Sequence, residues 1–412
     1  MSSQSARPNY SDRSRARLRA ELDVGLRRLH GAARVLLGAT THGDPVERNR
    51  LVHSVARGEY AKPRWQWNPV SVERGVWLEL ARARRLAADC EASELYLARL
   101  EELETELLIL ENLGRCKQVR PMAARLFGTG SERLFTDAEH SVLDAAHEIL
   151  ATAPVERELK TIPARSADRS NLRDLMLAYA KHVGLHIAVK VDPDLIANAA
   201  VGERTVFIAD RLFGAHEAQR LAVHEVYGHL VSAFNGRTQT LGIFAMGTAG
   251  SYGDQEGVAI YLEELAGLLD SFRQRTLAGR LLATHAMHAG VSFGDAAQIL
   301  VREHRFSPAC AVTLCERSFR AGGVSRDAVY LTGWLRVRRA VGRGETNLSE
   351  LQVGKVSLGA VPELRRLIRE GLVSQPTYLS NLARSRGKTG AGTKSATFPP
   401  SLVTSLTKLD AT

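Results

Sequence analysis

The sequence has no long hydrophobic run, and its four cysteines form no CxxC pair. Without about 18 uninterrupted apolar residues, no transmembrane helix is expected. The charged first residues are followed by no apolar segment, which is not the pattern of a secretory signal. Scattered cysteines in a chain of 412 residues without such a signal are typical of reduced thiols. We therefore expect a cytoplasmic protein with no membrane partner.

Nucleic-acid-binding motifs are also lacking, although the charge balance would invite one. The chain has 55 basic and 45 acidic residues, which gives a formal net charge of +10 at pH 7. The arginines are spread over predicted helix faces among glutamates, and no nucleic-acid motif accompanies them. We therefore expect no nucleic-acid partner. The excess positive charge instead favours acidic polypeptides.

Hydrophobic periodicity divides the chain into three regions. Residues 1–160 carry leucines at helical spacing and predict a helical N-terminal region. Residues 161–383 combine helices with a strand at 185–191 and a hairpin at 199–209, and they predict a domain of the α+β class. Residues 384–412 are rich in Gly, Ser, Thr and Lys with little to bury, so they predict a disordered tail.

The segment from His224 to His229, with the sequence HEVYGH, carries the clearest chemical pattern. Zinc peptidases place two histidines four residues apart on one helix, with a glutamate beside the first. Here the spacing is five, which on an ideal helix sets the imidazoles roughly 140° apart. Both can face one metal only if the helix widens locally. We therefore predict a π-bulge within residues 225–229, with Gly228 easing the distortion.

Two histidines on a helix are more often unrelated polar residues than metal ligands. Glu225 weakens that interpretation, because a carboxylate in an apolar stretch is costly unless it is paired or functional. A third ligand is expected from a following helix. Glu256 is the best candidate, since it follows a Gly-rich loop near a predicted helix start. Glu263 and Glu264 compete with it, and the alternative for both is a solvated helix flank.

Three blocks of sequence occur together in this chain. They are HEVYGH followed by residues 235–239, QEGVA at 255–259, and residues 317–323 followed by 327–333. Together they resemble the QEGLA-motif metallopeptidase family, which includes the microtubule-associated tyrosine carboxypeptidases. The start of the chain, residues 7–10, is also similar. Two positions depart from the family pattern, because Tyr227 replaces a glycine and Val258 replaces a leucine.

The resemblance implies a zincin-like core with a small sheet, which carries the HExxxH helix and a zinc ion. The ligands of this Zn2+ would be His224, His229 and Glu256, and Glu225 would be the general base of a peptidase. Two neutral imidazoles and one carboxylate leave a coordination position for water, as in catalytic zinc sites. We expect hydrolysis of a peptide bond at or near the C-terminus of a peptide or protein, and a tubulin-directed specificity is not carried over.

Such a carboxypeptidase needs two further groups. One is an oxyanion donor, for which Tyr330 is the first candidate; Tyr252 is the second and also a substrate-binding candidate. The other is a cation for the terminal carboxylate, and the planar fork of arginine suits this role. Arg317, Arg320 and Arg237 are the candidates for it. The alternative interpretations are packed tyrosines and ordinary surface salt bridges.

Two alternative functions stay open at this point. One is a zinc endopeptidase or an amidohydrolase acting on a small amide, for which a groove open at both ends would be diagnostic. The other is a non-catalytic metal-containing binding protein. Four protein ligands closing the metal shell would support the second alternative.

Overall fold

The computed structural model describes residues 12–34, 45–133, 141–154, 160–167, 170–195 and 197–384. Residues 7–10 and the predicted tail beyond Arg384 lie outside these ranges. Small sheets accompany many helices, so the protein is mixed α and β, which agrees with the expected α+β class. Within the described ranges, no helix has the length and apolar character needed to cross a membrane.

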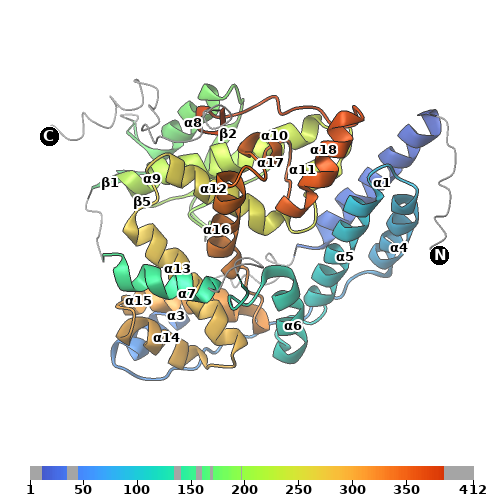
Figure 1. The fold of residues 1–412 in the computed structure, drawn as a ribbon. Coiled ribbons are helices and arrows are strands. Elements are labelled where there is room, and N and C mark those ends of the chain that lie inside the picture. The colour runs from blue at the N-terminus through green and yellow to red at the C-terminus, as the bar shows by residue number, and fades with distance from the viewer. Residues whose placement is uncertain are drawn as a thin grey trace.

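The first described helices fall into two groups. Helices α1, α4 and α5 pack side by side at one end of the molecule (Figure 1). Helices α3 and α7 instead pack against the later helices α15 and α13. The bounds are α1 (Asp12–Ala32), α3 (Pro45–Ala56), α4 (Arg74–Ala88), α5 (Ser93–Leu110), α6 (Cys116–Phe127) and α7 (Val142–Thr152).

Two small sheets precede the helix that carries the histidines. Strand β4 (Thr205–Ala209) pairs parallel with β2 (Ala188–Asp192) and antiparallel with β3 (Ala199–Val201). The predicted hairpin at 199–209 is therefore confirmed, and the predicted strand begins three residues later than expected. A second sheet pairs β1 (Thr161–Pro163) antiparallel with β5 (Leu212–Gly214). Helix α8 (Leu172–His182) lies between β1 and β2 in the chain.

The histidine-bearing helix is continuous but changes its winding. It runs as α9 (Ala215–Ala222), a π-helix at Val223–Leu230, and α10 (Val231–Thr238). The predicted π-type widening is confirmed, and it spans a longer segment than the expected bulge. Because a π-turn holds more residues per turn than an α-turn, five positions now bring side chains back to one face.

Asn235 anchors the far end of this helix to the C-terminal part of the chain. Its Nδ2 donates hydrogen bonds to the backbone carbonyls of Gln352 and Tyr378, each at 2.8 Å. Its Oδ1 accepts from the backbone N–H of Tyr378, also at 2.8 Å. Next to it, a Cβ on Gly236 would lie 2.3 Å from the carbonyl oxygen of Phe244. The rotation of α10 about its axis is therefore fixed by buried contacts.

Glycines allow α12 (Ser251–Leu265) and α16 (Ala328–Gly342) to cross with their backbones in contact. A Cβ on Gly257 would lie 2.2 Å from the carbonyl oxygen of Gly333, and a Cβ on Gly333 would lie 2.2 Å from that of Gly253. The same helix meets the π-helix closely, because a Cβ on Gly228 would lie 2.5 Å from Ala259 Cβ. These contacts bring α12, and Glu256 on it, against the histidine-bearing helix.

We expect Gly257→Ala to destabilise the fold. In an exposed helix this change stabilises by about 0.5–1 kcal/mol, but here the added methyl meets a backbone carbonyl that cannot rotate away. Overpacking of this kind costs about 1–3 kcal/mol. Thermal melts of the purified variant measure the change. The matched control is Gly75→Ala in α4, where nothing lies within 4 Å of the added Cβ; equal melting shifts in both variants would contradict the close crossing.

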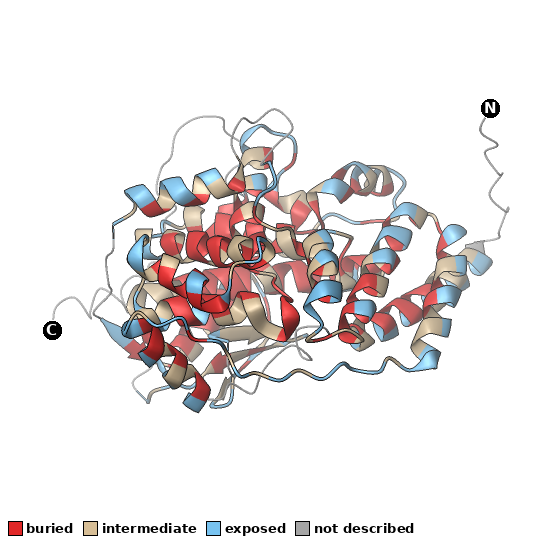
Figure 2. Ribbon diagram, turned by 90° about the horizontal axis from the view of Figure 1, so that it is seen from below, coloured by how far each residue is buried: buried red, intermediate tan, exposed pale blue. Residues whose placement is uncertain are grey.

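One apolar core joins the early and late parts of the chain. The buried cluster contains Leu22 and Leu107 from the first helices together with Leu262 and Leu331 from α12 and α16. Buried residues fill the centre of the molecule and exposed ones lie along its outer helices (Figure 2).

The remaining elements are α11 (Ile243–Met246), α13 (Ser271–His288), α14 (Phe293–Arg302), α15 (Pro308–Phe319), η2 (Arg320–Gly322), α17 (Leu348–Leu351), η3 (Leu358–Ala360), α18 (Val361–Arg369) and α19 (Asn381–Arg384). The domain boundaries at 160/161 and 383/384 stay predictions.

Candidate metal centre

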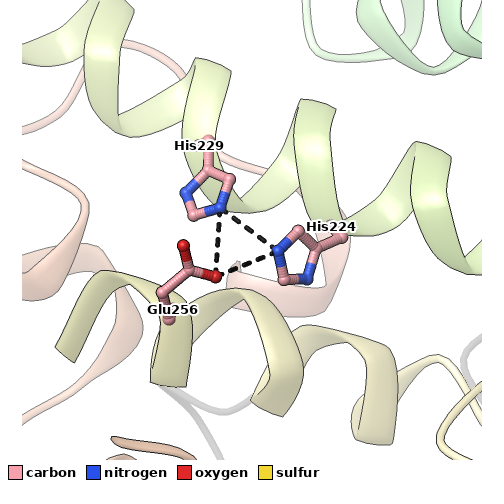
Figure 3. Close-up of side chains that lie close together, drawn as sticks. All are labelled: His224, His229 and Glu256. Atoms are coloured by element: carbon pink, nitrogen blue, oxygen red, sulfur yellow. Dashed lines mark hydrogen bonds and ion pairs between the residues drawn. The ribbon is translucent and has the colours of Figure 1, made fainter. Parts of the chain in front are cut away.

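The π-helix and α12 bring His224, His229 and Glu256 together, as Figure 3 shows. One ligand atom from each residue lies within 4.8 Å of the other two. The Nε2 atoms of the two histidines are 3.2 Å apart, and Glu256 Oε2 lies 3.2 Å from His224 Nε2 and 3.6 Å from His229 Nε2. The imidazole rings are nearly perpendicular, at 83°. Two nitrogens and one oxygen therefore converge on one point.

The donor set fits a divalent metal ion such as zinc. Glu256 Oε2 is buried and has no hydrogen-bond donor in good geometry among the described residues. Burial alone would raise the pKa of the Glu256 carboxyl, but the charge of His229 and the contact with His224 lower it well below its usual range. A buried carboxylate that stays ionised and lacks a donor is suited to a cation.

The electrostatics of His224 point the same way. Burial would lower the pKa of this imidazole, but the contacts with Glu256 and Glu263 outweigh burial and raise it to about 9. The surroundings thus favour a positive charge between these groups. Metal ions replace protons on ligating imidazoles, so metal binding at this site is expected to release protons.

Glu263 holds the other nitrogen of His224. Its Oε1 lies 2.6 Å from His224 Nδ1, which leaves Nε2 facing Glu256. The Glu263 carboxylate is fully buried and accepts two hydrogen bonds from Arg273, from Nε and Nη2, each at 3.1 Å. Arg220 Nη1 lies 3.7 Å from Glu263 Oε1. Carboxylates in this position fix the tautomer and the ring orientation of a metal-binding histidine.

The two competing glutamates thus differ in what they contact. Glu263 reaches His224 from behind, whereas Glu264 turns away and accepts a hydrogen bond from Trp334 Nε1 at 2.7 Å. Neither is part of the three-residue cluster. Burial would raise the pKa of Glu263, but the charges of Arg273 and Arg220 lower it to about 2. Glu263 is therefore an ionised carboxylate that supports His224.

A family model described as microtubule-associated tyrosine carboxypeptidase matches residues 72–398, which is most of the chain. The chain belongs to this family. Comparison with curated proteins gave no match. Membership indicates a peptidase of the carboxypeptidase type, and the matched region contains all three residues of the cluster.

Glu225, the general-base candidate of this family member, follows His224 directly in the π-helix. It is buried, with 8 % of its surface exposed. Its carboxylate makes no hydrogen bond or ion pair with the other described residues, in contrast to Glu263. A carboxylate beside the cluster that is not held by another side chain can take up and release a proton.

Two of the predicted site residues of this carboxypeptidase family member are tyrosines, Tyr330 and Tyr252, and the charge of Glu256 acts on the first of them. Tyr252 lies one turn before Glu256 on α12, and Tyr330 comes from the start of α16. Burial raises the pKa of Tyr330 well above its usual value, and the negative charge of Glu256 raises it further. Tyr330 therefore keeps its proton and can donate a hydrogen bond. Tyr252 packs edge-on against Phe127, with ring centroids 6.0 Å apart.

The three predicted arginines have different surroundings. Arg317 makes a two-pronged contact with the buried Asp327, through Nε and Nη2 at 2.7 Å each. Arg320 Nε donates to a backbone carbonyl at 3.2 Å. Arg237 is exposed at the end of α10, with its Cζ 4.3 Å from the centroid of the Phe234 ring. Their substrate-binding roles stay predictions, and the fork of Arg317 is already engaged.

Sequence reasoning missed two arginines on α13. Arg273 supports Glu263, and Arg280 lies with its Cζ 4.7 Å from the centroid of the Tyr330 ring. Neither belongs to a quoted motif, and an arginine-rich chain hides both. The available signal for Arg280 was its position among the apolar residues of 277–282, where an unpaired charge is costly.

Proposed function

We propose that this protein is a zinc-dependent carboxypeptidase with a zincin-like core. His224, His229 and Glu256 would hold the Zn2+ ion. The observation that carries the proposal is the convergence of these three ligand atoms within 4.8 Å, beside a buried glutamate at the position of a general base. Membership of a family described by carboxypeptidase activity supports the choice of a C-terminal peptide bond.

The chain's own residues supply the proton transfer. Zinc, when bound, would lower the pKa of the attacking water to about 7 and would polarise the scissile carbonyl. Glu225 accepts a proton from the attacking water and passes it to the nitrogen of the leaving amino acid. Glu263 keeps the proton of His224 on Nδ1, so Nε2 stays available as a ligand. Tyr330, which stays protonated, is the group we propose to stabilise the developing oxyanion.

The test is a metal analysis combined with a peptide-cleavage screen. Protein purified with zinc supplied is assayed for metal per chain, and a mixture of peptides is followed by mass spectrometry. We expect one zinc per chain and stepwise loss of residues from C-termini, with both lost in His229→Ala. A chain that takes up no metal would overturn the proposal.

The same screen separates the alternatives. Cleavage at internal bonds would identify an endopeptidase, and hydrolysis confined to small amides would identify an amidohydrolase. Zinc retained without any hydrolysis, in a shell of four protein ligands, would identify a metal-containing binding protein.

We further propose that the substrate is an acidic polypeptide. The net charge of +10 supports this, as does the gathering of several arginines around Tyr252 and Tyr330. Attraction between exposed charges weakens with ionic strength. Cleavage that is indifferent to salt and to upstream acidic residues would contradict the acidic preference and leave the carboxypeptidase proposal intact.

A further inference from the structure

Four arginines gather next to Tyr252 and Tyr330, and we name this group the arginine wall. It comprises Arg280, Arg317, Arg320 and Arg326, from α13, α15, η2 and the loop before α16. Asp327 is the carboxylate that faces them, and it acts on the pKa values of Arg280, Arg317 and Arg320. Four guanidinium groups against one described carboxylate leave the wall with an excess of positive charge.

The arginines of the wall differ in which donors remain free. Arg317 is neutralised by its two-pronged contact with Asp327, and Arg320 uses its Nε on a backbone carbonyl. Arg280 and Arg326 each have a buried Nε with no hydrogen-bond acceptor among the described residues. Buried guanidinium donors without acceptors cost free energy, and they are suited to an anion that binds from outside.

Of these two, Arg280 is better placed to meet a substrate at the metal centre. Arg326 is held between two rings, with its Cζ 4.9 Å from the Phe127 centroid and 4.5 Å from the Tyr252 centroid. Arg280 stacks on Tyr330, and Tyr330 in turn is influenced by the charge of Glu256. Arg280 thus contacts the tyrosine on which the charge of Glu256 acts.

The charge on Arg280 is destabilised in the absence of an anion. Burial and, after it, the neighbouring charge of Arg317 together lower the pKa of Arg280 to about 10. A carboxylate at this place would relieve both effects. Arginine presents two parallel donors to a carboxylate, which gives geometric selectivity as well as attraction.

We propose that Arg280 binds the α-carboxylate of the substrate's C-terminal residue, and that Arg317, tied to Asp327, forms the support behind it. This inference rests on the proposed carboxypeptidase function. Sequence patterns favoured Arg317, Arg320 or Arg237 for this role, whereas the two arginines of the wall that keep a free Nε, Arg280 and Arg326, lie outside the recognised motifs.

The experiment compares two peptides that differ only at the C-terminus. One ends in a free carboxylate and the other in an amide, and both carry the same fluorophore. Binding is measured by anisotropy on zinc-loaded protein carrying Glu225→Gln, so that no cleavage is required. The variants added to this background are Arg280→Gln, Arg280→Lys, Arg326→Gln and, as the control, Arg369→Gln on the exposed end of α18.

We expect the parent to bind the acid about 10–100-fold more tightly than the amide, as one charge-assisted contact allows. Arg280→Gln should lose this preference by weakening the acid alone. Arg280→Lys should restore part of it, and Arg369→Gln should match the parent. Because burial and Arg317 disfavour the charge of Arg280 and its Nε has no acceptor among the described residues, Arg280→Gln should also melt at a higher temperature than the parent, whereas loss of a structural ion pair would lower the melting temperature.

An acid preference that survives Arg280→Gln overturns the assignment, as does its loss in Arg326→Gln but not in Arg280→Gln. If Arg280→Gln fails to fold, Arg280→Lys carries the test. An acid preference weaker than that of the parent then supports the assignment, and an unchanged preference overturns it. A chain that cleaves nothing yet shows an acid preference dependent on Arg280 would refute the proposed function and keep this inference. Cleavage of C-termini with an acid preference that does not depend on Arg280 would support the proposed function and refute this inference.

Discussion

Replacing Glu225 with Gln is expected to remove peptidase activity while leaving the zinc content unchanged. The amide is nearly isosteric with the carboxylate, so the π-helix and the three ligand side chains should keep their places. It cannot accept a proton from the attacking water, however, and a positioned general base contributes about 10²–10⁴-fold to the rate. The measurement is kcat/KM for release of the C-terminal amino acid from a peptide, with zinc per chain determined on the same sample.

Glu264→Gln is the matched control for this prediction. Glu264 lies on α12, as Glu256 does, but bonds to Trp334, so its variant should keep near wild-type activity. If Glu225→Gln cleaves as well as the wild type, the general-base assignment is wrong. If it loses both zinc and activity, Glu225 would be needed for metal binding, which the geometry does not indicate.

Removing the Glu263 carboxylate is expected to weaken both the fold and the metal site. Glu263→Ala leaves Arg273 and Arg220 buried without their shared partner, and breaking a buried ion pair in this way costs about 3–5 kcal/mol. It also frees the ring of His224, and loss of such a supporting contact typically reduces metal affinity about 10–100-fold. Urea unfolding of metal-free protein measures the first effect, and zinc titration against a competing chelator measures the second.

Glu263→Gln separates the two effects. The amide oxygen can still accept from His224 Nδ1, so metal affinity should fall less than in the alanine variant, while the unpaired arginines still destabilise the fold. Equal zinc affinity in the wild type and in folded Glu263→Ala would show that His224 is held by its helix alone. Equal stability of all three proteins would mean that the arginines find other partners.

The histidine-bearing helix was predictable because the residues that identify it lie within one short segment of the sequence. The spacing between His224 and His229 requires a widened helix, and the structure has a π-helix there. The sheet hairpin was predictable for the same reason, since alternation and turn residues are local signals. Glu256 was named from a motif on a different helix, and the tight approach of Gly228 to Ala259 is what brings that helix close enough.

The supporting residues were not predictable in the same way. Glu263 contacts a histidine 39 positions earlier in the chain, and nothing in its own helix distinguishes it from Glu264, which bonds elsewhere. Arg317 was a sound candidate for carboxylate binding by type, but its role depends on Asp327, whose side chain engages its fork only in the folded chain. Which arginine keeps free donors is a property of tertiary packing and has no periodicity.

The π-helix has a consequence for how this sequence can change. Compared with an α-helix, it holds one additional residue between the two histidines, so deleting that residue would restore the usual four-residue spacing. The same deletion would turn everything after it by about 100°, moving Asn235 away from the carbonyls of Gln352 and Tyr378 and Gly236 away from Phe244. The spacing of the two histidines and the packing of α10 are thus coupled. A deletion of one residue that changes the first also disrupts the second.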